Sequence, residues 1–168
     1  IDILSKRKSN NPLLIGEAGV GKTALVEGVV THLVDAYRVS PSGPPKIVLQ
    51  LDVGSIMAGT HLRGALADRI RSLQSEVKDA DGQVYLFIDE LHSLFGNQAD
   101  GGADAANELK VSLARGDFPC IGATTITEYR EHIETDAALA RRFSTVLVEE
   151  PSPEETETIV YGSLPRYE

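Results

Sequence analysis

The sequence predicts one α/β domain built on a five-stranded parallel sheet with helices on its faces. Short apolar segments alternate along the chain with segments in which apolar residues recur at helical spacing. One of the short segments, residues 84–88 (VYLFI), is an unbroken apolar run, which is typical of a parallel strand buried on both faces. The 168 residues are enough for one domain with a core and too few for two ordinary domains.

The expected strands and helices follow one another in a regular order. The strands are expected at residues 13–15, 46–52, 84–88, 118–123 and 143–148. The helices are expected at 22–37, 66–77, 105–115, 126–135 and 136–142, with a helix tail at 1–10 and a last helix after Ser152. A turn at Asn11-Pro12 should lead into the first strand, and the Pro- and Gly-rich residues 41–45 should form a loop. The last helix has a clear start signal, because Glu155 stands three residues after Ser152.

A phosphate-binding loop pattern, GEAGVGKT, follows the first strand. Backbone N–H groups bind a polyphosphate, and glycine lets the backbone approach it closely. Lys22 would reach the β- and γ-phosphates, and the Thr23 hydroxyl would ligate Mg²⁺. The alternative is a glycine-rich turn without a ligand, which the strand–loop–helix context disfavours. The residues expected to cradle the nucleotide are Gly16, Glu17, Ala18, Gly19, Val20, Gly21, Lys22 and Thr23.

Two adjacent carboxylates, Asp89 and Glu90, directly follow the buried run 84–88. Carboxylates placed after a buried strand are costly unless a cation or a reaction uses them. Open α/β sheets also bind their ligands at the carboxyl ends of the strands. We therefore expect Asp89 to hold Mg²⁺, through a water molecule, and Glu90 to polarise the water that attacks the γ-phosphate. An ordinary acidic turn is the alternative.

The composition narrows the class of protein. A net charge of −9 argues against broad, nonspecific contact with nucleic acid. No apolar run approaches the roughly 18 residues that suggest a membrane helix. The single Cys120 cannot form an internal disulfide, which fits a cytoplasmic location, and it is expected in the core. The four histidines, at 32, 61, 92 and 132, have no metal-ligand spacing and are interpreted as structural.

The chain resembles the AAA+ ATPases, and specifically the first ATPase module of the Clp family of hexameric unfoldases and disaggregases. The resemblance covers nearly the whole sequence from about residue 10. It implies the large α/β subdomain of a P-loop NTPase, a three-layer α/β/α fold. The blocks that carry it are residues 10–12 leading into the phosphate loop, FIDELH at 87–92, DAANELK at 104–110, ARG at 114–116, IGATT at 121–125, EYR at 128–130 and DAALARRF at 136–143.

The resemblance also implies roles that spacing alone does not show. Thr125 aligns with the sensor residue that detects the γ-phosphate, and Arg141 and Arg142 align with arginine fingers offered to a neighbouring subunit. Two arginines at a helix end would also complement the helix dipole. A loop containing His61, Leu62 and Arg63 aligns with the pore loop that grips a threaded polypeptide, although the family usually has an aromatic residue where this chain has Leu62.

The function expected from these observations and from the resemblance is an ATP-hydrolysing motor module of a ring chaperone, a hexamer in this family, that remodels, unfolds or disassembles proteins by threading. ATP and Mg²⁺ are the expected cofactors, and protein substrates and further copies of the chain are the expected partners, with no nucleic acid or membrane. Two alternatives are an AAA+ ATPase that acts on DNA and a nucleotide-dependent scaffold with little turnover. Because the first residue is Ile1 and not Met, we expect a fragment of a longer polypeptide. The resemblance implies that this fragment lacks the family's helical lid.

Overall fold

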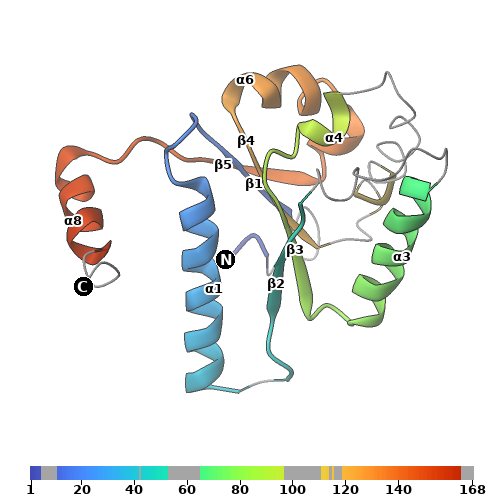
Figure 1. The fold of residues 1–168 in the computed structure, drawn as a ribbon, viewed down its shortest axis with the longest axis horizontal. Helices are drawn as coiled ribbons and strands as arrows, with labels where there is room; N and C mark the ends of the chain where they lie inside the picture. Colours follow the sequence, from blue (N-terminus) through green and yellow to red (C-terminus); the bar gives the residue numbers. More distant parts are fainter. Residues whose placement is uncertain are drawn as a thin grey trace.

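The computed structural model describes residues 1–4, 11–41, 43–52, 65–96, 111–113, 115 and 119–163. Within them, five parallel strands form one sheet in the order β2-β3-β4-β1-β5 (Figure 1). The strands are β1 (Asn11–Ile15), β2 (Ile47–Gln50), β3 (Val84–Ile88), β4 (Cys120–Thr124) and β5 (Phe143–Leu147). The predicted fold class and each of the predicted strands are confirmed.

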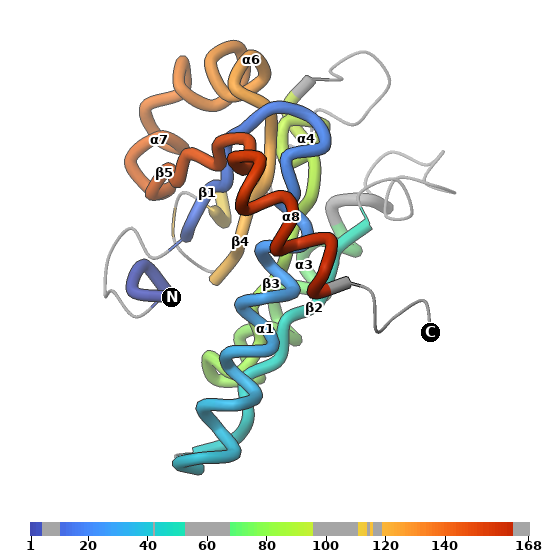
Figure 2. The backbone as a smooth tube through the Cα atoms, turned by 90° about the vertical axis from the view of Figure 1, so that its left-hand side faces the viewer, coloured from blue at the N-terminus to red at the C-terminus, as the bar shows by residue number. Residues whose placement is uncertain are grey.

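Helices connect the strands and cover the sheet. They are α1 (Lys22–Val39), α3 (Ala65–Asp79), α4 (Ser93–Gly96), α6 (Ile126–Glu128), the π-helix η1 (Tyr129–Ile133), α7 (Ala137–Ala140) and α8 (Pro153–Ser163). Figure 1 shows α1 on one side of the sheet and α3 on the other, with α8 apart from the sheet, and Figure 2 gives the view turned by 90°. No helix in the described part of the chain combines the length and apolarity needed to cross a membrane.

Two apolar clusters lie on opposite faces of the sheet. Successive residues of a strand point to opposite faces, so Leu13 joins the cluster under α3 while Leu14 joins the cluster under α1. Helix α3 contributes Ile70 and Val77 to the first cluster, and helix α1 contributes Val26 to the second. A sheet that is buried on both faces accounts for the continuous apolar runs of its central strands.

The structure changes three details of the predictions. Asn11 and Pro12 lie inside β1 rather than in a turn before it, and the Asn11 side chain accepts a hydrogen bond from the Cys120 N–H. The segment predicted as a helix from 126 to 135 is α6 followed by a π-helix. Residues 2–4 form a turn rather than a helix. The predicted pore loop and most of the helix at 105–115 fall outside the described residues.

The strand order brings three chain segments together. Strands β3, β4 and β1 are neighbours and run parallel, so their carboxyl ends meet at one edge of the sheet. Gly16 follows β1, Asp89 follows β3 and Thr125 follows β4. The backbone ties two of these ends directly, because Gly16 N–H donates to the Thr124 carbonyl at 3.3 Å. This edge is where ligands bind in open α/β sheets.

Candidate functional site

The phosphate loop has the backbone that its glycines require. Gly16 is buried, and a Cβ on it would lie 2.3 Å from the Val148 carbonyl oxygen, so no side chain fits there. Gly19 and Gly21 have φ angles of 83° and 97°, in the left-handed region that other residues rarely adopt. These two conformations turn the chain from β1 into α1.

The N-terminus of α1 is open to an anion. The helix begins at Lys22, as predicted, and its N-cap is Gly21, which offers no capping side chain. The first turn contains no acidic residue. The N–H groups of the first turn and the positive end of the helix dipole are therefore available to a phosphate.

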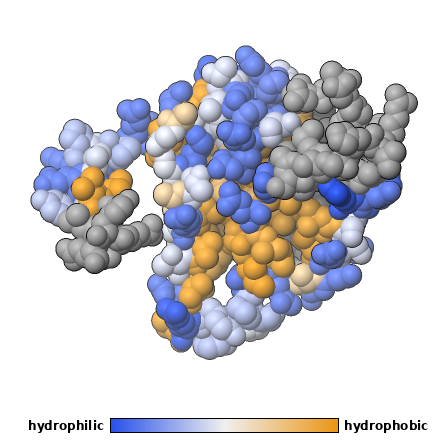
Figure 3. All heavy atoms as spheres, in the orientation of Figure 1, coloured by the Kyte–Doolittle hydropathy of each residue, from blue (hydrophilic) through white to orange (hydrophobic). Residues whose placement is uncertain are grey.

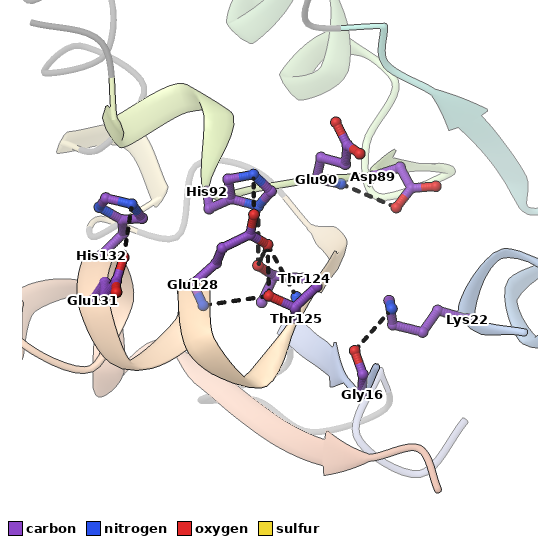
Figure 4. Close-up of polar contacts among 10 residues, drawn as sticks. All are labelled: Gly16, Lys22, Asp89, Glu90, His92, Thr124, Thr125, Glu128, Glu131 and His132. Atoms are coloured by element: carbon purple, nitrogen blue, oxygen red, sulfur yellow. Dashed lines mark hydrogen bonds and ion pairs between the residues drawn. The ribbon is translucent and has the colours of Figure 1, made fainter. Parts of the chain in front are cut away.

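Lys22 lies against its own loop in this structure. Its Nζ donates to the carbonyl oxygen of Gly16 at 2.9 Å (Figure 4). It also donates to the carbonyl oxygen of Glu17 at 2.8 Å. The ammonium group is thus held at the mouth of the loop by two neutral acceptors. A phosphate, which carries charge, would be a stronger acceptor for the same donors.

Thr23 and Asp89 connect the loop to the end of β3. The Thr23 hydroxyl donates to Asp89 Oδ2 at 2.9 Å, although the two residues are 66 positions apart in the chain. The other oxygen of Asp89 accepts the backbone N–H of Glu90 at 3.0 Å. The two residues predicted to hold Mg²⁺ are therefore in direct contact.

Glu90 occupies an unusual backbone conformation. Its φ angle is 49°, the left-handed region, where a residue with a Cβ is strained. Its side chain is exposed, and in Figure 4 its carboxylate extends away from Lys22 and Thr125. A rotation of this side chain would be needed before it could act on a group bound between them.

Thr125 is the N-cap of α6. Its hydroxyl accepts the Glu128 N–H at 3.3 Å, and the Glu128 carboxylate accepts the Thr125 N–H at 3.3 Å. This reciprocal pair is a capping box. The pattern Thr-x-x-Glu was visible in the sequence, but Glu128 was not singled out there as a site residue.

His92 takes part in the site, which differs from the interpretation of all four histidines as structural. Its Nε2 lies 2.9 Å from Glu128 Oε1, and its Nδ1 lies 3.1 Å from the Thr124 hydroxyl. Its ring stacks on that of His132, with ring centroids 6.4 Å apart. The only sequence signal for this role was its position two residues after Glu90.

One cavity of about 610 Å³ joins these groups. The residues that line it are Ala18, Gly19, Gly21, Lys22, Thr23, Ala24, Asp89, Glu90, His92, Thr124, Thr125 and Glu128. It thus contains most of the predicted loop residues, both predicted carboxylates and the predicted sensor. Gly16, Glu17 and Val20 shape the loop without lining the cavity. Arg141 and Arg142, at the end of α7, also lie outside its lining.

The comparison with known protein families shows to which family the chain belongs. The family model described as "ATPase family associated with various cellular activities (AAA)" matches residues 12–149, which is most of the chain. The chain belongs to the AAA family of ATPases. This AAA assignment confirms the predicted P-loop fold class and agrees with the phosphate loop, the paired carboxylates and the sheet order described above.

Among curated AAA relatives, the chaperone protein ClpB of Rhodopirellula baltica is 53% identical over the whole chain, and that of Oceanobacillus iheyensis is 51% identical. The chain spans 19% and 21% of the lengths of these two relatives. The resemblance to Clp-type AAA modules is therefore confirmed.

Two solved structures are similar to the chain as well. A closed-state structure of Hsp104 with ATPγS and FITC-casein has a TM-score of 0.80 and 40% identity over 99% of this chain and 29% of that one. The ADP complex of Hsp104 from S. cerevisiae has a TM-score of 0.81 and 39% identity over 99% of this chain and 23% of that one.

Proposed function

We propose that this chain is the ATP-binding and ATP-hydrolysing module of a Clp-type ring chaperone, in which residues 1–168 form the large α/β subdomain. The observation that carries the proposal is the contact between Thr23 and Asp89, which joins the phosphate loop to the end of β3 across one cavity. A glycine-rich turn without a ligand has no need of this arrangement. The presence of Lys22, Asp89, Glu90 and Arg141 argues against an assembly scaffold with little turnover, because a degenerate site usually loses one of these residues.

Each part of the cavity has a role in hydrolysis. The open N-terminus of α1 and Lys22 bind the β- and γ-phosphates, and Lys22 exchanges its two carbonyl acceptors for phosphate oxygens. Glu90 polarises a water molecule and accepts its proton as the water oxygen attacks the γ-phosphorus. The bond from that phosphorus to the bridging oxygen breaks, so ADP and phosphate leave. Thr125, on the opposite wall, contacts the water or the γ-phosphate.

The residues present fit Mg²⁺. Mg²⁺ prefers oxygen ligands. The Thr23 hydroxyl oxygen would bind the ion, and Asp89, whose Oδ2 lies 2.9 Å from that oxygen, would hold it through a water molecule. The described residues contain no cluster of three or more His, Cys, Asp or Glu side chains that could hold a metal. Water and phosphate oxygens would therefore complete the shell, as is usual for this ion, and bound Mg²⁺ would neutralise phosphate charge.

Assembly into a ring is part of the same proposal. Arg141 and Arg142 lie outside the cavity of their own chain, which is what a residue offered to a neighbouring subunit requires. The surface also has apolar area to cover: Figure 3 shows apolar side chains gathered in the region of the edge strand β2, where Ile47 and Leu49 are 46% and 48% exposed. The Clp-type relatives support protein substrates, and a cytoplasmic location stays a prediction.

The pore loop extends this proposal to the substrate. Leu62, with His61 and Arg63, would contact a threaded polypeptide with an aliphatic rather than an aromatic side chain. Leu offers less contact area than Tyr, so the pore loop would grip the substrate polypeptide less firmly during each ATP-driven movement. The substitution Leu62→Tyr should strengthen substrate processing, and Leu62→Ser should weaken it. Basal ATPase activity should be unchanged in both variants.

Two variants of the full-length protein test the proposed function. Lys22→Ala should abolish ATP binding, because it removes the cation that faces the phosphates. Glu90→Gln should preserve binding and block hydrolysis, because the amide keeps the shape but cannot accept a proton. Binding is measured with a fluorescent ATP analogue and hydrolysis by phosphate release. If both variants bind and hydrolyse ATP like the parent, the proposed function is wrong. Tight, salt-dependent DNA binding by the parent would favour a DNA-acting ATPase instead.

A further inference from the structure

Four polar groups converge on the carboxylate of Glu128 (Figure 4). The Thr125 hydroxyl lies 2.8 Å from Oε2, the Thr125 N–H 3.3 Å from it and the Thr124 hydroxyl 3.4 Å from it. His92 Nε2 lies 2.9 Å from the other oxygen, Oε1. A helix cap needs only the two backbone contacts of the capping box. The contacts with His92 and Thr124 therefore exceed what capping requires.

The number of available protons fixes the direction of the Thr125 hydroxyl. A hydroxyl has one proton to donate and two lone pairs that accept, whereas an ionised carboxylate only accepts. The short contact with Glu128 therefore uses the Thr125 proton. One lone pair of Thr125 accepts the Glu128 N–H. Toward the cavity, Thr125 then has only the second lone pair, so it can accept a hydrogen bond there but cannot donate one.

His92 keeps the Glu128 carboxylate in this position. Its Nε2 must be the donor to Oε1, because the carboxylate has no proton, and the ring is held by its stacking on His132. Burial alone would raise the pKa of Glu128, but the Thr125 and Thr124 hydrogen bonds and the charge of His92 outweigh burial and lower it. The carboxylate consequently stays ionised at neutral pH and continues to accept.

We propose that Glu128, held by His92, is a positioning residue for ATP hydrolysis: its carboxylate accepts the hydrogen bond that the Thr125 hydroxyl donates. Thr125 can then accept a hydrogen bond from the attacking water but cannot donate one to the γ-phosphate. This inference rests on the proposed function of the site. A water molecule held by Thr125 has one hydrogen directed at that oxygen and its other hydrogen available to Glu90. Glu128 thus acts on the reaction through Thr125 and does not contact the reacting atoms.

The decisive variant is Glu128→Gln in the full-length protein. Gln fills the capping-box position as well as Glu does, so the N-terminal cap of α6 is kept. The amide can donate to the Thr125 oxygen, which removes the constraint on its hydroxyl. We expect kcat to fall about tenfold, as for a lost hydrogen bond to a charged group, while the KM for ATP is unchanged. The matched control is Glu134→Gln at the end of η1, an exposed carboxylate outside the cavity lining, which should match the parent.

A second comparison tests whether Glu128 works through Thr125. Thr125→Val should also lower kcat, and adding Glu128→Gln to it should cause no further loss. Losses that multiply in the double variant would overturn the proposal. If Glu128→Gln lowers the unfolding midpoint, His92→Gln, which leaves the capping box intact, provides the same readout: kcat should fall severalfold with KM unchanged.

The outcomes separate this inference from the proposed function. If the parent hydrolyses ATP, Glu90→Gln blocks it and neither Glu128→Gln nor His92→Gln changes kcat, the positioning role is wrong and the proposed function stands. If the parent binds no ATP, both are wrong. A kcat loss for Glu128→Gln together with an equal loss for Glu134→Gln would also overturn the positioning role, because a general effect of surface charge would explain both.

Discussion

The Thr23 hydroxyl donates a 2.9 Å hydrogen bond to Asp89 Oδ2. Thr23 is the second residue of α1 and Asp89 directly follows β3, so the bond connects a helix on one face of the sheet to the end of a central strand. Neither side chain is deeply buried, and the pair is accessible from the cavity. A cation entering the cavity can therefore reach both oxygens together.

This pair predicts a specific dependence on Mg²⁺. Asp89→Asn replaces the carboxylate by a neutral amide, which is a weaker hydrogen-bond acceptor for the water that would join Asp89 to Mg²⁺. We expect the Mg²⁺ concentration for half-maximal ATPase activity to rise about tenfold in the full-length protein, as for the loss of one hydrogen bond to a charged group. The measurement is a Mg²⁺ titration at fixed ATP concentration. Thr23→Ser, which keeps the hydroxyl, is the control and should titrate like the parent.

Gly16 and Gly28 predict opposite effects of the same substitution. At Gly16 a Cβ would lie 2.3 Å from a backbone oxygen, so Gly16→Ala should destabilise the module by about 1–3 kcal/mol and weaken nucleotide binding. At Gly28, inside α1, nothing lies within 4 Å of the added methyl group. Gly28→Ala should raise stability by about 0.5–1 kcal/mol because alanine favours a helix. The unfolding midpoint and the affinity for a fluorescent nucleotide are measured for both variants. Equal effects of the two substitutions would contradict the close approach of Gly16 to the Val148 carbonyl oxygen.

The location of Arg141 outside its own cavity predicts that it acts between subunits. In the full-length protein, Arg141→Ala should lower ATP turnover by roughly 10³-fold, as for other arginine fingers, without weakening ATP binding. The 168-residue chain alone should hydrolyse ATP slowly for the same reason. Arg38→Ala, which removes an exposed arginine of α1 paired with Asp35, is the control. Rapid turnover by a demonstrably monomeric chain would show that no arginine from a neighbour is needed.

Burial of Cys120 predicts slow reaction with thiol reagents in the folded protein. Burial raises the pKa of the Cys120 thiol from 9.0 to about 12, so its thiolate fraction at pH 8 falls about a thousandfold. The same shift means that the contribution of this neutral thiol to stability is complete below pH 9 and is lost as the pH rises from about 9 to 12. Labelling with a maleimide across a urea series should follow unfolding. Fast labelling of the native protein at pH 8 would contradict the burial.

The sequence alone was sufficient where the signal is local. The phosphate loop is recognised from particular residues at adjacent positions. The buried strand before Asp89 is recognised from the apolar composition of residues 84–88 alone. The start of α8 at Pro153 was also predictable, because Ser152 and Glu155 form a capping box and exchange hydrogen bonds at 3.2 and 2.8 Å. For these features the neighbours in the chain supply the physical cause.

Other features depended on how the strands are ordered. Asn11 looked like a turn residue, but its amide is buried in β1 and satisfies the Cys120 N–H, which no local pattern could indicate. His92 and Glu128 are 36 positions apart in the sequence and belong to different connections. Only the parallel pairing of β3 with β4 places the residues that follow those strands beside each other. The sequence by itself thus predicted the residues of the loop and the paired carboxylates, whereas the tertiary structure decided which distant side chain, that of His92, contacts Glu128. Contacts between segments that follow different strands depend on spatial order rather than on sequence spacing.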